Sequence, residues 1–302
     1  MNDLKAHIEK LKKEKNAVIL AHYYVHDEVQ EVADFIGDSF YLSKIATTID
    51  ADTIVFCGVS FMGESAKILN PEKTVLMPDE TADCPMAHMA DIEQINALRE
   101  KYPDLAVVCY INSTAELKSH SDVCVTSSNA LKIVKALPNK HIFFIPDENL
   151  GRYVAAQVPD KHFIFNDGFC HVHTAIKETQ VKAAKNIHPN ALFLVHPECQ
   201  QNIIALADFV GSTSEIIDYA TASNAGEFII GTELGVLYEL KQQNPDKHFY
   251  AAGSAQCCPN MKKISLDKIV HVLETGEHAI EIDDDLREAC NLPLNRMLAL
   301  AK

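Results

Sequence analysis

Short runs of apolar residues separated by helical patterns recur along the whole chain. In the middle of the chain, the apolar run at 107–110 is followed by helical stretches at 116–122, 127–137 and 151–157. Apolar strands that alternate with helices are typical of βαβ units, in which a parallel sheet is buried on both faces. The pattern therefore predicts an α/β protein with helices on both sides of short parallel sheets.

This pattern occurs three times. The segments 18–46, 107–134 and 192–220 align without a gap around an Asp that follows a small residue, at Asp34, Asp122 and Asp208. The first two of these anchors are 88 residues apart and the last two 86, and a Lys ahead of a later strand repeats as well, at Lys73, Lys161 and Lys247. We expect three pseudo-equivalent α/β/α sandwich domains, each with four short parallel strands, in a pseudo-threefold arrangement. Their predicted ranges are 1–86, 87–172 and 173–302, the last including a C-terminal segment.

A cysteine follows the last predicted strand of each unit, at Cys84, Cys170 and Cys258. These cysteines are separated by 86 and 88 residues, so they share the period of the Asp anchors. Threefold symmetry would bring the three loops together on one axis. Three thiolates without a fourth counterpart would form a metal site with one open coordination position, which is what a catalytic metal needs.

Spacing alone does not choose the metal. Zinc with three cysteines and a cubane cluster with three cysteine-bound irons both satisfy the count. Burial in the core is the alternative for any single cysteine, and we favour it for Cys57, Cys109, Cys124, Cys199 and Cys290. Cys257 is adjacent to Cys258 and is either a redox partner or a plain neighbour.

Polar side chains follow the first strand of each unit, at His22 and Tyr24, Tyr110 and Asn112, and His196 and Glu198. Their spacing of two directs both members of a pair to one side of the strand. Ligands collect beyond the carboxyl ends of parallel strands, so we expect these groups to supply acid–base chemistry that no unit has alone. We assign no role to His26, His171 and His173.

A hydroxyl precedes a helical stretch in each unit, at Ser39, Ser127 and Thr213. Such a residue caps a helix, and free N–H groups at a helix start bind anions. Helix capping without any ligand is the simpler interpretation for one such residue. Three around one axis would suit a substrate with several carboxylates or a phosphate.

Composition narrows the class of protein further. Hydrophobic residues make up 47% and charged residues 23%, which are globular values, and the net charge of −15 disfavours nucleic acid as a partner. The N-terminal 20 residues read as a charged helix that enters a strand, and no stretch approaches a membrane span. Nine cysteines without a secreted spacing pattern suit reduced thiols, so we expect a cytoplasmic enzyme without membrane partners.

Taken together, the motifs resemble the quinolinate synthase family of de novo NAD biosynthesis over essentially the whole chain. The matching motifs are LAHYY at 20–24, GDS at 37–39, DCPMA at 83–87, CYINS at 109–113, TSSNA at 126–130, GFCHVH at 168–173, HPEC at 196–199, GST at 211–213 and CCPNM at 257–261. Some relatives end in a longer C-X-X-C-X-X-C motif, which this chain lacks, so a regulatory disulfide of that kind is not expected.

The resemblance implies a triplicated α/β/α fold and a 4Fe-4S cluster held by Cys84, Cys170 and Cys258, with one open iron. It implies condensation of iminoaspartate (iminosuccinate) with dihydroxyacetone phosphate to give quinolinate, phosphate and water, and it leaves room for a transient partner that supplies iminoaspartate. The substrate-binding residues implied are His22, Ser39, Tyr110, Ile111, Asn112, Ser127, His196, Pro197, Glu198 and Thr213. Glu198, His196, Tyr24 and Tyr110 are the expected catalytic residues.

Two other functions are compatible with parts of the pattern. An aconitase-like hydro-lyase would use the same open iron on a single hydroxy acid. An iron or redox sensor would use Cys257 and Cys258 as a switch, but the sequence has no basic or DNA-reading segment as an output surface.

Overall fold

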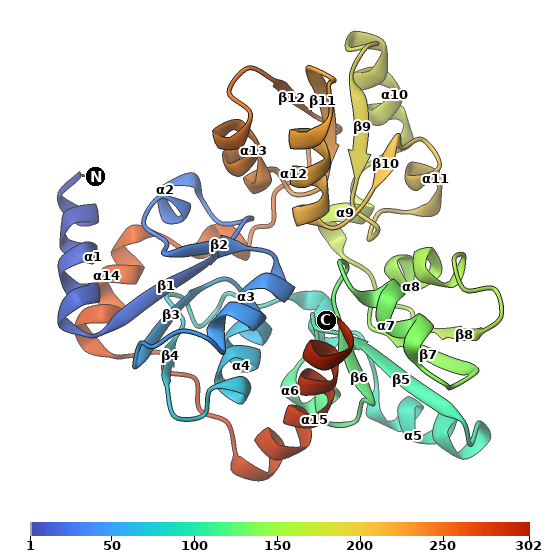
Figure 1. The fold of residues 1–302 in the computed structure, drawn as a ribbon, viewed down its shortest axis with the longest axis horizontal. Helices are drawn as coiled ribbons and strands as arrows, with labels where there is room; N and C mark the ends of the chain where they lie inside the picture. The colour runs from blue at the N-terminus through green and yellow to red at the C-terminus, as the bar shows by residue number, and fades with distance from the viewer. Residues whose placement is uncertain (1) are drawn as a thin grey trace.

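The computed structural model describes residues 2–302 and contains three parallel sheets of four strands each. The strand orders are β2-β1-β3-β4, β6-β5-β7-β8 and β10-β9-β11-β12, so all three sheets have the same topology. In Figure 1 the three units surround a common centre, and helices flank each sheet. The predicted class of three α/β/α units with short parallel sheets is confirmed.

The first unit contains the sheet that is nearest the N-terminus in the sequence. Its strands are Ala17–His22 (β1), Phe35–Gly37 (β2), Thr53–Cys57 (β3) and Thr74–Leu76 (β4). Its helices are Asn2–Glu14 (α1), Asp27–Gln30 (α2), Ser39–Ala46 (α3), Ser60–Leu69 (α4) and the 3₁₀ turn Pro85–His88 (η1).

The second unit repeats this order. Its strands are Leu105–Tyr110 (β5), Val123–Val125 (β6), His141–Ile145 (β7) and His162–Phe165 (β8). Its helices are Ile92–Lys101 (α5), Ala115–Ser119 (α6), Ala130–Ala136 (α7), Glu148–Ala155 (α8) and His171–Thr174 (α9).

The third unit and the C-terminal helices complete the chain. The strands are Leu192–Val195 (β9), Phe209–Val210 (β10), Glu227–Gly231 (β11) and His248–Ala251 (β12). The helices are Glu178–Ile187 (α10), Gln201–Ile204 (α11), Thr213–Ala222 (α12), Leu234–Val236 (η2), Leu237–Gln243 (α13), Met261–Lys263 (η3), Leu266–Thr275 (α14) and Asp284–Leu300 (α15).

The repeated Asp anchors join the first two strands of each sheet. Each carboxylate accepts a hydrogen bond of 2.7 Å from a backbone amide of the first strand, and each Asp amide donates to the carbonyl of that same residue at 2.9 Å. The pairs are Asp34 with Ile19, Asp122 with Val107, and Asp208 with Phe193. This role in strand pairing explains why the anchor repeats.

The repeated lysines stabilise the ends of helical segments. Lys161 donates to the carbonyl of Leu137 at 2.7 Å and Lys247 to that of Ala220 at 2.6 Å, while Lys73 contacts the carbonyl of Ile49. A cation at a helix C-terminus satisfies carbonyls that have no partner within the helix. The Asp and Lys repeats therefore maintain the fold, and neither belongs to the site.

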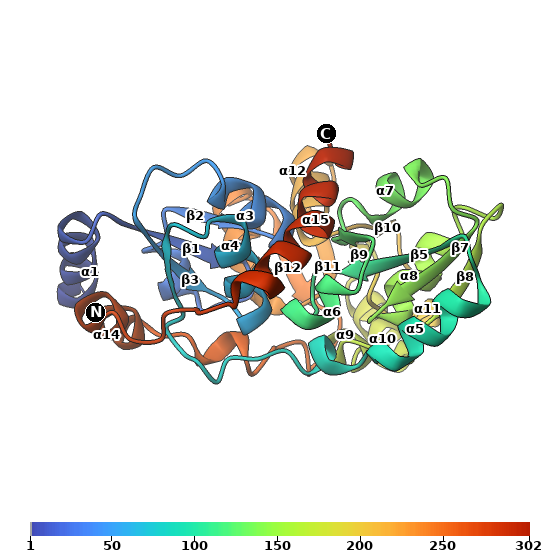
Figure 2. The ribbon, with the colours of Figure 1, turned by 90° about the horizontal axis from the view of Figure 1, so that it is seen from below.

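The C-terminal segment packs on the first two units. Helix α14 lies against α1, and α15 contacts α6, β6 and α4 (Figure 2). The Cys290 thiol donates to the carbonyl of Ala115 at 2.8 Å, and Leu294 and Met297 are buried in the core shared by these two units. The predicted boundaries 1–86, 87–172 and 173–302 stay a prediction, but the helices after residue 265 are not packed as part of the third sandwich.

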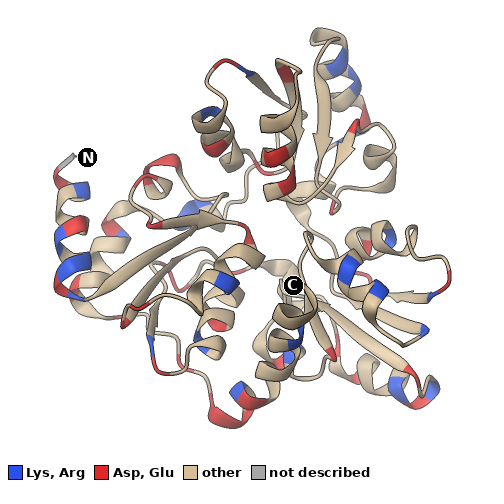
Figure 3. Ribbon diagram, viewed as in Figure 1, with Lys and Arg blue, Asp and Glu red and all other residues tan. Residues whose placement is uncertain are grey.

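Charged residues of both signs lie mainly on the outer helices of the three units (Figure 3). Within residues 2–302, no helix combines the length and apolar character that crossing a bilayer requires.

Candidate active site

A cavity of about 70 Å³ lies beyond the carboxyl ends of the three sheets and is lined by residues of all three units. Twelve of the predicted site residues line it. They are His22, Tyr24, Ser39, Cys84, Tyr110, Asn112, Ser127, Cys170, His196, Glu198, Thr213 and Cys258. All three units contribute to this single space, as a ring of equivalent positions predicts.

Two residues expected from the family resemblance do not line the cavity. Ile111 and Pro197 are buried between lining residues. The amide of Ile111 donates to the carbonyl of Val125 at 2.8 Å, and its carbonyl accepts from Ser113 at 2.8 Å. Since these backbone groups are engaged in the fold, Ile111 positions its neighbours Tyr110 and Asn112.

The three cysteines lie in loops that follow β4, β8 and β12 and are held in the same way. In each unit an amide just beyond the third strand donates to the carbonyl two residues before the cysteine. These bonds run from Ser60 to Ala82 at 2.8 Å, from Glu148 to Gly168 at 2.8 Å and from Leu234 to Gln256 at 2.9 Å. The sulfurs are thereby directed to one cavity, and all three cysteines are partly buried.

Burial raises the pKa of all three thiols, that of Cys84 to about 12. Glu198 and Cys258 add to the shift at Cys84, and Glu198 and Cys84 add to it at Cys170, so ionisation of one thiol disfavours that of the next. A bound cation would reverse this effect, because metals bind thiolates and release their protons. The donor set therefore fits a cationic metal centre.

The remaining cysteines divide as expected. Cys57, Cys109, Cys124, Cys199 and Cys290 are buried, and Cys257 is exposed beside Cys258. The prediction that the first five belong to the interior is confirmed.

His22 and His196 occupy equivalent positions at the ends of β1 and β9, and each contacts a backbone amide two residues further along the chain. The Nδ1 of His22 lies 3.2 Å from the amide nitrogen of Tyr24, and the Nδ1 of His196 lies 3.3 Å from that of Glu198. An amide can only donate, so Nδ1 of His22 accepts and its neutral ring carries the proton on Nε2. Nδ1 of His196 also lies 3.2 Å from Oε2 of Glu198, which can only accept from a ring nitrogen. Burial lowers the pKa of both histidines, that of His22 to about 3.

Glu198 is the buried carboxylate of the site, with 3% of its surface exposed. Its Oε2 lies 2.9 Å from Nδ1 of His173. Within residues 2–302, no group pairs with its Oε1. Burial favours the neutral acid, but the charge and hydrogen bond of His173, together with His196, outweigh burial and lower the pKa of Glu198. The result is a carboxylate with one oxygen held by histidine and one free.

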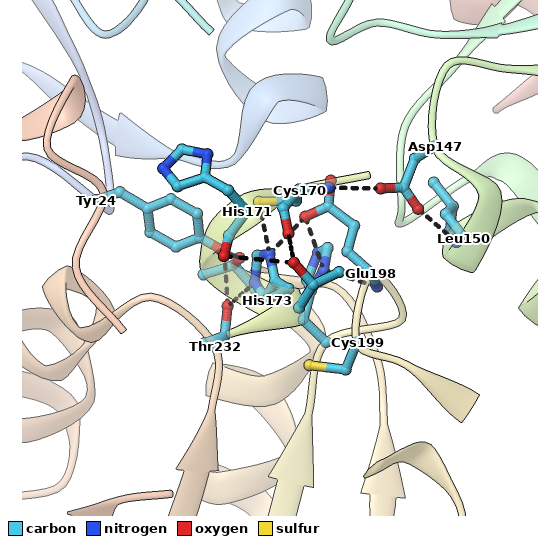
Figure 4. A network of polar contacts seen from close by, with 12 residues as sticks. Tyr24, Asp147, Leu150, Cys170, His171, His173, Glu198, Cys199 and Thr232 are labelled. Atoms are coloured by element: carbon cyan, nitrogen blue, oxygen red, sulfur yellow. Dashed lines mark hydrogen bonds and ion pairs between the residues drawn. The ribbon is translucent and has the colours of Figure 1, made fainter. Parts of the chain in front are cut away.

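A hydrogen-bonded chain connects Glu198 to the first unit (Figure 4). The Nε2 of His173 lies 2.9 Å from the Thr232 hydroxyl, which lies 2.8 Å from the Tyr24 hydroxyl. Burial raises the pKa of Tyr24 well above its usual value, so the phenol stays protonated and donates. His173 Nδ1 faces a carboxylate and therefore donates to it, and the Tyr24 hydroxyl at the other end of the chain also lies 2.7 Å from the Thr213 hydroxyl.

Neither His173 nor Thr232 is predicted as a site residue from the sequence. The residues three positions after the other two cysteines are Ala87 and Met261, so the repeat gave no signal for His173. Proximity to Cys170 in the GFCHVH motif was the only available cue. Its Nδ1 lies 3.2 Å from the Cys170 sulfur.

The prediction that the three repeated hydroxyls cap helices is wrong. Asp38 caps α3 by accepting from Tyr41, and Ser212 caps α12 by accepting from Glu215. Ser39 and Thr213 are therefore the first residues inside these helices, and Ser127 lies in the turn that precedes α7. A side chain relieved of capping is free to face the cavity, which all three of these residues line.

A second combination of groups could also hold a metal ion. One ligand atom each from Cys170, His173 and Glu198 lie within 4.8 Å of one another. This set would suit a single zinc ion. It shares only Cys170 with the three repeated cysteines, so substitution experiments can separate the two arrangements.

Buried His22 makes stability depend on pH. Its pKa is about 3 in the folded chain, against 6.5 for an unperturbed histidine. Between these values the unfolded chain binds the extra proton, so the free energy of unfolding falls as the pH falls from about 6.5 to about 3. His22→Asn does not titrate and should flatten this slope by about 1.4 kcal/mol per pH unit. Urea titrations of both proteins across this window measure the slope, and equal slopes would contradict the prediction.

The fold and the cavity together define a three-unit α/β enzyme with convergent thiols and a buried acid–base set. Residues 6–299 match the family described as the Quinolinate synthetase A protein. The chain belongs to this family, and it is an enzyme of NAD biosynthesis.

Its relatives match over nearly their full length. The chain is 54% identical over 298 residues to the quinolinate synthase of Caldicellulosiruptor saccharolyticus, and the matched region covers 99% of this chain and 98% of that protein. It is 52% identical over 300 residues to that of Clostridioides difficile, covering 99% and 98%. It is 52% identical over 298 residues to that of Fusobacterium nucleatum subsp. nucleatum, covering 99% of each.

Proposed function

We propose that the enzyme condenses iminoaspartate with dihydroxyacetone phosphate, giving quinolinate, phosphate and two waters, with a 4Fe-4S cluster on Cys84, Cys170 and Cys258. The observation that carries this proposal is the meeting of one thiol from each unit with Glu198 in one cavity. The thiols supply a ligand set with one open position, and Glu198 supplies a base beside it. A cytoplasmic location, where thiols stay reduced, is part of the proposal.

Three cysteine ligands would leave one iron of the cluster without a protein ligand, and that iron would supply Lewis-acid chemistry to a bound oxygen or nitrogen. The rest of the chemistry falls to the side chains around the cavity. Burial lowers the pKa of His22 and His196 and favours their neutral forms, and neutral His22 presents an Nε2–H donor rather than a fixed charge.

Glu198 is the proposed general base for triose isomerisation and the loss of water. Its Oε1 has no partner in the described chain, so this oxygen is available to a substrate proton. His173 holds the other oxygen at 2.9 Å and fixes the orientation of the carboxylate. The hydroxyls of Thr232 and Tyr24 extend the hydrogen-bonded chain to the first unit.

The neutral polar groups are the proposed substrate ligands. The Asn112 Oδ1 is buried without a hydrogen-bond partner among residues 2–302, and it lines the cavity. Burial raises the pKa of Tyr110 well above its usual value, so its hydroxyl remains a donor. Ser39, Ser127 and Thr213 add a hydroxyl from each unit, which suits a substrate with several anionic groups.

Substrate dependence tests the reaction directly. Anaerobically reconstituted enzyme should form quinolinate, measured by chromatography, only when iminoaspartate and dihydroxyacetone phosphate are both present. An aconitase-like hydro-lyase would instead dehydrate one hydroxy acid, and its turnover would be indifferent to the triose phosphate. Dehydration of a single hydroxy acid with no quinolinate from the pair would therefore replace the proposal with that alternative.

A further inference from the structure

Two of the cavity cysteines have their backbone amides bound by buried carboxylates. The amide of Cys170 donates to Oδ2 of Asp147 at 3.1 Å, and the amide of Cys258 donates to Oε1 of Glu233 at 3.1 Å. Figure 4 shows the first of these contacts. Asp147 and Glu233 each have 0% of their surface exposed. Burying a carboxylate costs free energy unless its oxygens accept hydrogen bonds. The hydrogen bonds that these two carboxylates accept therefore indicate why they are buried.

Asp147 and Glu233 occupy equivalent positions, each two residues beyond the third strand of its unit. Each uses its two oxygens in the same way. The second oxygen of Asp147 accepts from the amide of Leu150 at 2.7 Å and begins α8, while that of Glu233 accepts from Gly235 at 2.6 Å and begins η2. One carboxylate thus fixes both a helix start and a cysteine loop.

In the first unit the cysteine amide is bound by a more exposed carboxylate. Val59 stands at the equivalent position beyond β3, and the Cys84 amide donates instead to the adjacent Asp83, at 2.8 Å. The side chain of Asp83 is 45% exposed and also accepts from the Ser60 hydroxyl at 2.6 Å. All three amides are therefore occupied by a carboxylate, but only two of these carboxylates are withdrawn from water.

This arrangement has a consequence for a cluster on these cysteines. Backbone N–H groups close to an iron–sulfur centre commonly donate to sulfur, and such hydrogen bonds help to set its reduction potential. Here the cysteines' own amides are engaged by carboxylates, and the amides that follow in each loop, such as that of His173 after Cys170, face the sulfur instead. Glu233 also contacts Lys262 at 3.3 Å, and Lys262 donates to the carbonyl of Tyr24 at 2.7 Å, which ties the third cysteine loop to the first unit.

We infer that Asp147 and Glu233 are positioning residues that fix the Cys170 and Cys258 loops, and the amides that follow these cysteines, for cluster binding. This inference rests on the proposed 4Fe-4S cluster.

Amide variants separate the two roles of each carboxylate. Asparagine is as good a helix cap as aspartate, so Asp147→Asn keeps one oxygen for Leu150 but loses the second acceptor for the Cys170 amide. Glu233→Gln makes the same change in the third unit. We expect either variant to lose its cluster to a chelator about 10-fold faster or more, with a midpoint potential that differs from that of the wild type. Asp83→Asn should have a smaller effect because water already reaches that carboxylate.

Asp91→Asn is the matched control. Asp91 caps α5 by accepting from Glu93 at 2.8 Å, and it does not line the cavity. A second measurement needs no cluster: in apo protein, Asp147→Asn should expose Cys170 to faster alkylation by iodoacetamide, with the rate at Cys84 unchanged. Wild-type rates of cluster loss and alkylation in Asp147→Asn and Glu233→Gln, together with a wild-type potential, would overturn the inference. Failure of wild-type enzyme to hold any cluster would instead refute the proposed function, and the alkylation rates would still test positioning.

Discussion

Single replacement of Cys84, Cys170 or Cys258 by serine is expected to reduce bound iron and sulfide to background and to abolish turnover. Each cysteine lines the central cavity from a different unit, and no other cysteine of the described chain lines it. A serine hydroxyl is a much weaker ligand than a thiolate for iron–sulfur centres. Iron and sulfide analysis with anaerobic absorption spectra measures the loss, and a brown cluster band distinguishes the cluster from zinc.

The matched control is Cys257→Ser, because Cys257 is exposed and adjacent to the proposed ligand Cys258 but does not line the cavity. Its cluster content should equal that of the wild type. The pattern among the variants also distinguishes the two metal arrangements. Retention of metal in Cys84→Ser and Cys258→Ser, with loss only in Cys170→Ser, would show a single ion on Cys170, His173 and Glu198 and would contradict the three-cysteine site.

Glu198→Gln should leave the cluster intact while the turnover number falls by about 10²- to 10⁴-fold, the range for loss of a general base. Glutamine keeps the size of the side chain but cannot take up a substrate proton. The free Oε1 beside the thiols and the fixed Oε2 on His173 make Glu198 the carboxylate best placed for this role. Quinolinate formation and the absorption spectrum of each preparation give the two readings together.

The control for this experiment is Glu239→Gln. Glu239 accepts from Gln243 within α13 and does not line the cavity, so turnover should stay at the wild-type level. Wild-type turnover in Glu198→Gln would remove this residue from the mechanism. Loss of iron in Glu198→Gln would show instead that the carboxylate holds the metal.

The repeat predicted most of the architecture because each unit pairs its strands through residues of the same type at equivalent positions. Asp34, Asp122 and Asp208 must pair two strands in every copy, so the anchor recurs at a fixed offset. The sequence could not assign the C-terminal helices to a unit. Burial of Leu294 and Met297 against the first two units depends on how those units are joined, which a local pattern does not encode.

The sequence by itself determined the α/β class, the threefold repetition and the set of equivalent thiols and polar groups. It could do so because units with the same fold carry similar residues at equivalent positions. The tertiary structure alone decided which groups work together. His173 and Thr232 connect Glu198 to Tyr24 in one chain, yet the four residues come from different parts of the sequence, and the repeat offsets did not indicate His173 or Thr232. Contacts between units occur once in the molecule, so repetition cannot reveal them.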